Sequence, residues 1–125
     1  MTNVLLVGAG GFLGAVARYG LVVWVARLVG PPTFPWAVLG ANVAGSLVIG
    51  LLAGIGEARH VWSPEARLFL FLGVLGGFTT FSSLTNDTLA LLRTGSYLSA
   101  AGNVGLTLVL GFAAVGVGFV VGKST

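Results

Sequence analysis

A run of small and polar residues, GGFTTFSSLTND (76–87), interrupts a strongly apolar part of the sequence. Two adjacent glycines are followed by hydroxyl and amide groups and by Asp87, the only acidic residue inside an apolar segment. Such groups can bind ions, because hydroxyls and amides donate hydrogen bonds and carbonyls freed from a helix coordinate cations. The composition does not indicate an enzyme, since no nucleophile is paired with a histidine and the single histidine, His60, lies in a polar connector.

Polar side chains also occur inside the other apolar segments. Arg18 fits two interpretations, a buried functional charge and an arginine whose head reaches the lipid headgroups, and the sequence leaves both open. Asn42 is too short to reach the headgroups, so its amide needs a partner, water or an ion. Ser99, Asn103 and Thr107 recur every four residues and therefore line one face of a helix. Nearly all of these groups can donate a hydrogen bond, which favours an anion as the bound species.

The elements that position these groups are membrane-spanning helices. Of the 125 residues, 56% are hydrophobic and only 7% are charged, whereas a soluble domain carries roughly 25% charged residues. Four apolar segments each reach the roughly 20 residues that a spanning helix needs. We expect a single four-helix transmembrane domain over residues 1–125, with spans at about 4–29, 36–56, 68–92 and 97–122. The first span should end at GPPTFP (30–35), where glycine and proline stop a helix. Trp24, Trp36, Trp62 and Tyr97 lie near span ends, as interfacial aromatic residues do.

Glycine spacing predicts how the spans pack. Gly10 and Gly14 recur at four residues in the first span, and Gly50 and Gly54 do so in the second. Small residues at this spacing allow helix backbones to approach closely in lipid. A dinucleotide-binding turn in VLLVGAGGFLGA (4–15) is excluded, because no acidic residue follows before Glu57. In the third span, glycines 76 and 77 and the following threonines predict a helix break at the bilayer midplane, where protein or water must satisfy the freed backbone groups.

The charges predict little bias in membrane orientation. Four spans place both termini and the second connector on one side, which carries Arg59, Arg67 and Lys123, and the other side carries Arg27 and Arg93. Because orientation follows the side richer in lysine and arginine, insertion both ways with antiparallel pairing and insertion one way remain open. The basic residues are scattered rather than clustered, which excludes a nucleic-acid partner.

Three motifs in this order resemble the CrcB/Fluc fluoride channel family. They are GGFLGAVARYG (10–20), WAVLGANVAGSLVIG (36–50) and GGFTTFSSLTND (76–87), and the resemblance covers essentially the whole chain. It implies an all-α membrane protein of four transmembrane helices with a broken third helix, which forms an antiparallel, dual-topology homodimer in the cell (inner) membrane. The implied function is passive, selective export of fluoride, which reduces fluoride toxicity.

The resemblance also assigns site residues. A structural sodium ion at the dimer centre is implied to bind the backbone carbonyls of Gly76 and Thr79. Phe81 matches the first of two phenylalanines whose positive ring edges face fluoride. The residues implied to line the fluoride pore are Arg18, Asn42, Phe81, Ser82, Ser83, Leu84, Thr85, Asp87, Asn103 and Thr107.

The chain departs from the family pattern at two positions. Leu84 stands where the second phenylalanine is expected, and Gly111 stands where a serine is frequent. Either each fluoride pore works with one aromatic residue in place of two, or this chain is a supporting subunit that pairs with a second, homologous chain in a heterodimer. A small multidrug exporter is the remaining alternative, and it is disfavoured because the first span has no acidic residue and carries Arg18 instead.

Overall fold

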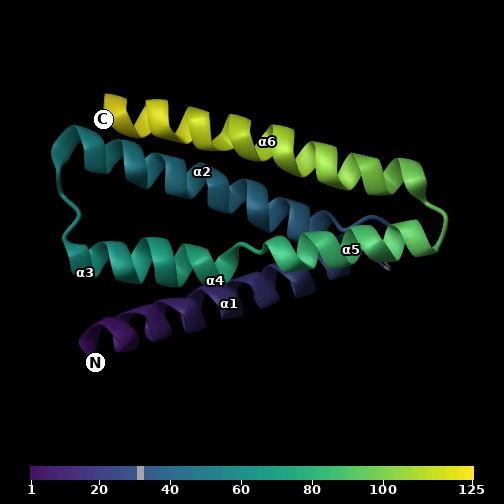
Figure 1. The fold of residues 1–125 in the computed structure, drawn as a ribbon, viewed down its shortest axis with the longest axis horizontal. Coiled ribbons are helices and arrows are strands. Elements are labelled where there is room, and N and C mark those ends of the chain that lie inside the picture. The colour runs from purple at the N-terminus through teal and green to yellow at the C-terminus, as the bar shows by residue number, and fades with distance from the viewer. Residues whose placement is uncertain (31–32) are drawn as a thin grey trace.

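The computed structural model describes residues 1–30 and 33–125, and the described chain is all-helical. Four helical segments are long and apolar enough to cross a membrane, which confirms the predicted fold class in this respect. Three are single helices, and the third, Pro64–Arg93, is assembled from four shorter pieces (Figure 1). The elements are α1 (Thr2–Val29), α2 (Trp36–Arg59), α3 (Pro64–Arg67), η1 (Leu68–Leu75), α4 (Gly76–Phe78), α5 (Phe81–Arg93) and α6 (Tyr97–Ser124).

Local signals explain where the helices begin and end. α1 stops at Gly30, whose φ of 71° only glycine adopts without strain; the prolines at 31 and 32 lie outside the described residues. α2 runs three residues beyond the expected end, to a left-handed cap at His60. The third segment begins four residues early, because the Ser63 hydroxyl accepts a hydrogen bond from Ala66 N at 3.1 Å and Pro64 occupies the first helical position.

The four segments pack as two pairs, α2 with α6 and α1 with the first half of the third segment (Figure 1). Glycines make the α2–α6 contact: each of four glycines faces a backbone carbonyl of the other helix so closely that a Cβ atom would overlap it. The four pairs are Gly50 with Val115, Gly54 with Phe119, Gly118 with Leu47 and Gly122 with Leu51. The predicted glycine seam is confirmed, and it joins helices that are far apart in the sequence.

The second pair uses the same device. Gly10 and Gly14 of α1 face backbone atoms of η1, and Gly77 of α4 would place a Cβ 2.7 Å from Gly11 O. η1 is wound as a π-helix, whose i→i+5 hydrogen bonds widen the turn immediately before the break. The seam predicted from Gly10 and Gly14 is therefore confirmed as well.

The break in the third segment lies within the predicted stretch of two glycines and two threonines, at the threonines, while the glycines remain helical. Gly76 has helical dihedral angles of −62° and −36°, and the chain becomes extended only at Thr79 (ψ 156°) and Thr80 (ψ 124°). The glycine pair does not itself leave the helix, because Gly77 is required for close approach to α1. Threonine side chains can hydrogen-bond nearby backbone groups in place of the helix, which makes Thr79 and Thr80 the natural breakpoint.

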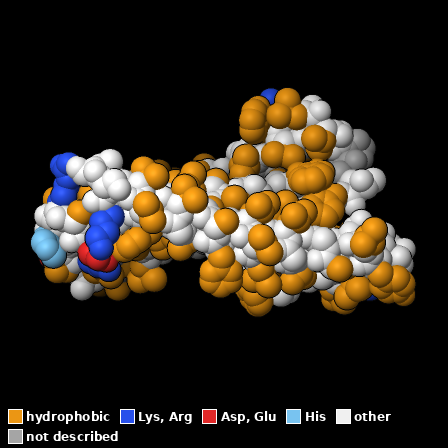
Figure 2. Space-filling view, turned by 90° about the horizontal axis from the view of Figure 1, so that it is seen from above, with side chains coloured by type: hydrophobic (Ala, Val, Ile, Leu, Met, Phe, Trp, Pro, Cys, Tyr) orange, Lys and Arg blue, Asp and Glu red, His pale blue; other side chains and the backbone are white. Residues whose placement is uncertain are grey.

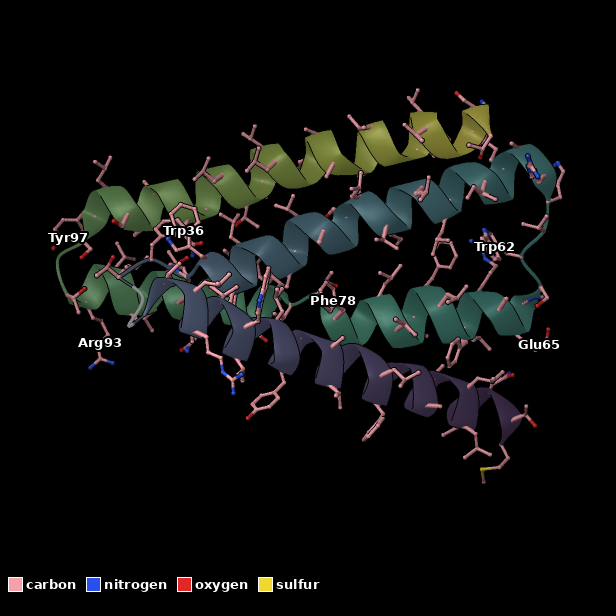
Figure 3. All side chains as sticks on the ribbon, turned by 180° about the vertical axis from the view of Figure 1, so that it is seen from behind. Trp36, Trp62, Glu65, Phe78, Arg93 and Tyr97 are labelled. Carbon is pink, nitrogen blue, oxygen red and sulfur yellow. The ribbon has the colours of Figure 1, made fainter. Side chains whose placement is uncertain are left out.

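Both termini and the connector between α2 and α3 lie at one end of the bundle (Figure 1), as the count of four spans predicts. Charged side chains gather at that end of the α2–α6 pair (Figure 2), where Lys123 Nζ lies 3.1 Å from Glu57 Oε1 and Arg59 donates to the Thr125 carbonyl. Figure 3 shows Trp36, Arg93 and Tyr97 at the opposite end, with Phe78 midway between the two.

One of the aromatic residues expected at the interface is turned inward. Trp36 and Tyr97 are exposed at the span ends, but Trp62 projects toward α2 (Figure 3). Its indole Nε1 donates to the Leu52 carbonyl at 2.6 Å, and its ring packs over Gly56 and edge-on to Phe71. The connector is thereby fastened to the bundle.

Candidate functional site

The site is built around the break in the third segment, and Asn42 of α2 fills the gap in its backbone hydrogen bonds. Asn42 Nδ2 donates to the Thr80 carbonyl at 3.0 Å, and Thr80 N donates to Asn42 Oδ1 at 2.8 Å. The asparagine amide thus pairs with one residue of extended chain as a neighbouring strand would. Sequence reasoning required a partner for this amide, and the structure supplies it within the same chain.

The break leaves carbonyls without the donor that a continuous helix would give them, among them those of Gly76 and Thr79. In an α-helix the amide of residue i+4 donates to the carbonyl of residue i. Thr80 N would serve the Gly76 carbonyl but is used by Asn42. Ser83 N would serve the Thr79 carbonyl but donates to Thr80 Oγ1 at 3.2 Å. Gly76 and Thr79 are the two residues implied to hold sodium, and carbonyl oxygens are the ligands that such a hard cation takes.

The beginning of α5 is held by a small hydroxyl network. The Thr80 hydroxyl is the N-cap of α5 and also lies 3.2 Å from Ser82 Oγ and 3.3 Å from Ser83 Oγ. Arg18 of α1 reaches the same place, with its guanidinium Nη1 3.5 Å from Ser83 Oγ. The Arg18 side chain is half-buried and points toward the break, which favours the interpretation of Arg18 as a functional charge.

A cavity of about 340 Å³ opens beside the break, between α2, α6 and the third segment. The expected site residues along its wall are Asn42, Gly76, Thr79, Phe81, Leu84 and Thr107. Sequence reasoning missed several further lining residues, among them Ser46, Phe71 and Thr80. Ser46 follows Asn42 by one helical turn, which was the available signal, and its hydroxyl donates to the Asn42 carbonyl at 2.7 Å. Phe71 carried no signal beyond apolarity.

The remaining expected residues fall into two other places. Ser82 and Thr85 are exposed on the outer side of α5, next to Phe81, which is 75% exposed. Asp87 lies toward the far end of the segment, in a separate hollow of about 450 Å³ that also contains Thr33 and Thr94. A single chain therefore does not bring the expected pore residues together along one continuous path.

On α6, the expected polar face points inward. Asn103 is fully buried, Thr107 is 8% exposed and Ser99 is half-buried. Asn103 Nδ2 donates to Thr88 Oγ1 at 3.0 Å, which joins α6 to α5. Thr88 was missed, although its position four residues after Leu84 places it on the buried side of the same helix.

Four apolar spans, with a midspan break whose backbone groups are held by the half-buried Asn42 amide, define a multi-pass membrane protein of the kind that binds ions within the bilayer. The family model described as CrcB-like protein, Camphor Resistance (CrcB), matches residues 5–119. The chain belongs to this family, and the resemblance drawn from the motifs is confirmed.

Curated relatives match over nearly the whole chain. A protein of Agrobacterium fabrum is 45% identical over 124 residues, covering 99% of this chain and 98% of the relative. One of Rhizobium meliloti is 46% identical over 117 residues, covering 90% and 93%. One of Parabacteroides distasonis is 43% identical over 124 residues, covering 99% and 95%. All three relatives are named Fluoride-specific ion channel FluC.

Proposed function

We propose that this chain is a fluoride-selective ion channel that lets fluoride leave the cell passively and so reduces its toxicity. Family membership and the shared name of the relatives support this function. The structural observation that carries it is the break at Thr79 and Thr80, where amides have been diverted from the Gly76 and Thr79 carbonyls. A break in a spanning helix is tolerated only where protein or a water-filled cavity satisfies the freed groups, and ion-transporting proteins build their ion sites at such breaks.

The conducting unit is proposed to be an antiparallel, dual-topology homodimer. Two observations support a second copy: the two ends of the bundle carry nearly equal numbers of basic residues, and the midspan face of Phe81, Ser82 and Thr85 is exposed in the single chain. Hydroxyl groups facing lipid are unfavourable, so this face needs protein to cover it. The expected pore residues of a single chain do not form one continuous path, and residues of a second copy would complete it.

The sodium ion is proposed to lie where the breaks of two copies meet. The donor set fits a monovalent cation, because Gly76 and Thr79 each offer a carbonyl that has lost its helical donor. Gly76 is exposed on the surface of the single chain, so its carbonyl can meet its counterpart in the partner. When bound, the ion supplies positive charge at the centre of the dimer, which favours nearby anions.

Fluoride is proposed to pass along the polar side chains of α2, α5 and α6. Asn42 has a second amide hydrogen beyond the one given to Thr80, and it lines the cavity. Phe81 offers a ring edge, and Ser82, Ser83 and Thr107 offer hydroxyl hydrogens. Thr85 lies on the same exposed face as Phe81, and its hydroxyl donates to the Ser82 carbonyl at 2.9 Å. Arg18 adds positive charge near Ser83. Asp87 lies at the end of the route and outside the cavity, and Leu84 forms part of the cavity wall.

Fluoride efflux from liposomes tests the proposal. The purified chain is reconstituted into liposomes loaded with potassium fluoride or potassium chloride, and efflux is followed with ion-selective electrodes after valinomycin is added. We expect rapid loss of fluoride with chloride retained, because larger halides cannot replace their hydration in so narrow a donor-lined path. Equal leakage of both anions would contradict the proposal. No efflux from this chain alone would favour the supporting subunit of a heterodimer, to which Leu84 points.

A further inference from the structure

A chain of two hydrogen bonds links the buried sides of α5 and α6. The Thr88 hydroxyl donates to the Leu84 carbonyl at 2.7 Å, and Asn103 Nδ2 donates to Thr88 Oγ1 at 3.0 Å. Leu84 lines the cavity beside the break, and Asn103 precedes Thr107, another lining residue, by one turn of α6. The link therefore connects two walls of the same cavity.

The direction of these bonds fixes the orientation of the Asn103 amide. A threonine hydroxyl has one hydrogen, and in Thr88 this hydrogen is used by the Leu84 carbonyl. Toward Asn103 the hydroxyl can therefore only accept, so the amide must present its NH₂ group. The carbonyl oxygen Oδ1 is turned away from Thr88. Since Asn103 is 0% exposed, bulk water cannot compete for this arrangement.

Two polar atoms remain unpaired next to this link. Among residues 1–30 and 33–125, neither Asn103 Oδ1 nor Thr107 Oγ1 has a hydrogen-bond partner, and both atoms are buried. Threonine in a helix commonly donates to the carbonyl four residues earlier, as Thr79 and Thr88 do here. Thr107 does not, so its hydroxyl hydrogen is free. Buried polar atoms are nearly always paired with protein or ordered water, so these two indicate a bound species.

We propose that Thr88 is a positioning residue for the fluoride path, and this inference rests on the function proposed above. By fixing the Asn103 amide, Thr88 keeps Oδ1 ready to accept a hydrogen bond from a water molecule held beside Thr107. The carbonyl oxygen itself would repel fluoride. The water donates one hydrogen to Oδ1 and points its other hydrogen toward the path. Through this water, the Asn103 carbonyl oxygen presents a hydrogen-bond donor to the ion. The water and the Thr107 hydroxyl then both donate to the passing ion.

Single-channel fluoride current in planar bilayers tests this inference, because current per channel does not depend on how much protein folds. Thr88→Val keeps the shape but removes both hydrogen bonds, and we expect the current to fall about fivefold, the factor given by one neutral hydrogen bond of ordinary net strength. Thr88→Ser keeps the hydroxyl and is expected to retain the wild-type current. In an Asn103→Leu background, Thr88→Val should cause no further loss, because the residue it positions is gone.

Each other outcome overturns the inference in a distinguishable way. A wild-type current in Thr88→Val, with only a lower yield of folded channel, would show that Thr88 serves packing alone. An equal loss in Thr88→Val with and without Asn103→Leu would show that Thr88 acts independently of Asn103. Absence of fluoride current from the wild-type chain would overturn the proposed function together with this inference.

Discussion

The α2–α6 contact and the break in the third segment hold the protein together by opposite means. At the α2–α6 contact, glycines bring two backbones together, and no side-chain hydrogen bond between the two helices is found among the described residues, apart from the ends of the chain. At the break, the backbone is opened, and Asn42 and Thr80 replace the lost hydrogen bonds. The comparison shows that close backbone packing can join helices in lipid without hydrogen-bonding side chains. Polar side chains are needed where the backbone leaves the helix and its amides and carbonyls require new partners.

The largest effect is expected from Gly118→Leu, which breaks the shape-based contact. A Cβ at Gly118 would overlap the Leu47 carbonyl, and overpacking of this kind costs about 1–3 kcal/mol at one site and more when two backbones must separate. We expect loss of folded, monodisperse protein by size-exclusion chromatography in detergent. Gly116→Leu is the matched control on the same helix, since its Cβ meets nothing within 4 Å. Equal yields of the two variants would contradict the role of the seam.

An intermediate effect is expected from Asn42→Leu, which breaks the polarity-based contact. The variant leaves the Thr80 amide and carbonyl unpaired, at a cost of about 1–3 kcal/mol in free energy of unfolding. Denaturant unfolding followed by tryptophan fluorescence in detergent measures it. Ser46→Ala, one turn further along α2, removes only a bond to its own helix and should change stability by less than about 0.5 kcal/mol. If both variants unfold alike, the Asn42 pairing does not stabilise the break.

The smallest effect is expected from Thr80→Ala, which removes the N-cap of α5 and the contacts of that hydroxyl with Ser82 and Ser83 but keeps the backbone pairing with Asn42. The side chain accepts from Ser83 N, and loss of an N-cap costs about 1 kcal/mol. Thr80→Ser should keep most of this stability, because serine caps as well as threonine does. The same unfolding measurement separates the two variants, and a serine variant as unstable as the alanine variant would show that the methyl group, not the hydroxyl, matters.

The parts that could be predicted from sequence are those set by local spacing. Apolar length marks the four spans, and glycines four residues apart mark both seams. The break was predicted within the glycine and threonine stretch, but its exact position was not, because adjacent glycines signal both helix breaking and close packing, and only the neighbour α1 decides between them. The Asn42–Thr80 pairing could not be predicted, since it joins residues 38 positions apart and depends on which helices become neighbours. The same is true of Thr88 and Asn103.

The pairing of helices that are distant in the sequence has a consequence for biosynthesis. α1 and α2 enter the membrane before the third segment and α6 but make few contacts with each other; α1 packs against η1 and α4, and α2 against α6. The Asn42 amide must therefore stay in the bilayer without Thr80 until the third segment has been inserted. The glycine faces of α2 remain covered by lipid until α6 leaves the ribosome. The helix pairs of this fold are thus completed only after α6 has been inserted, and a chain that has not yet reached α6 is the form that depends most on the insertion machinery.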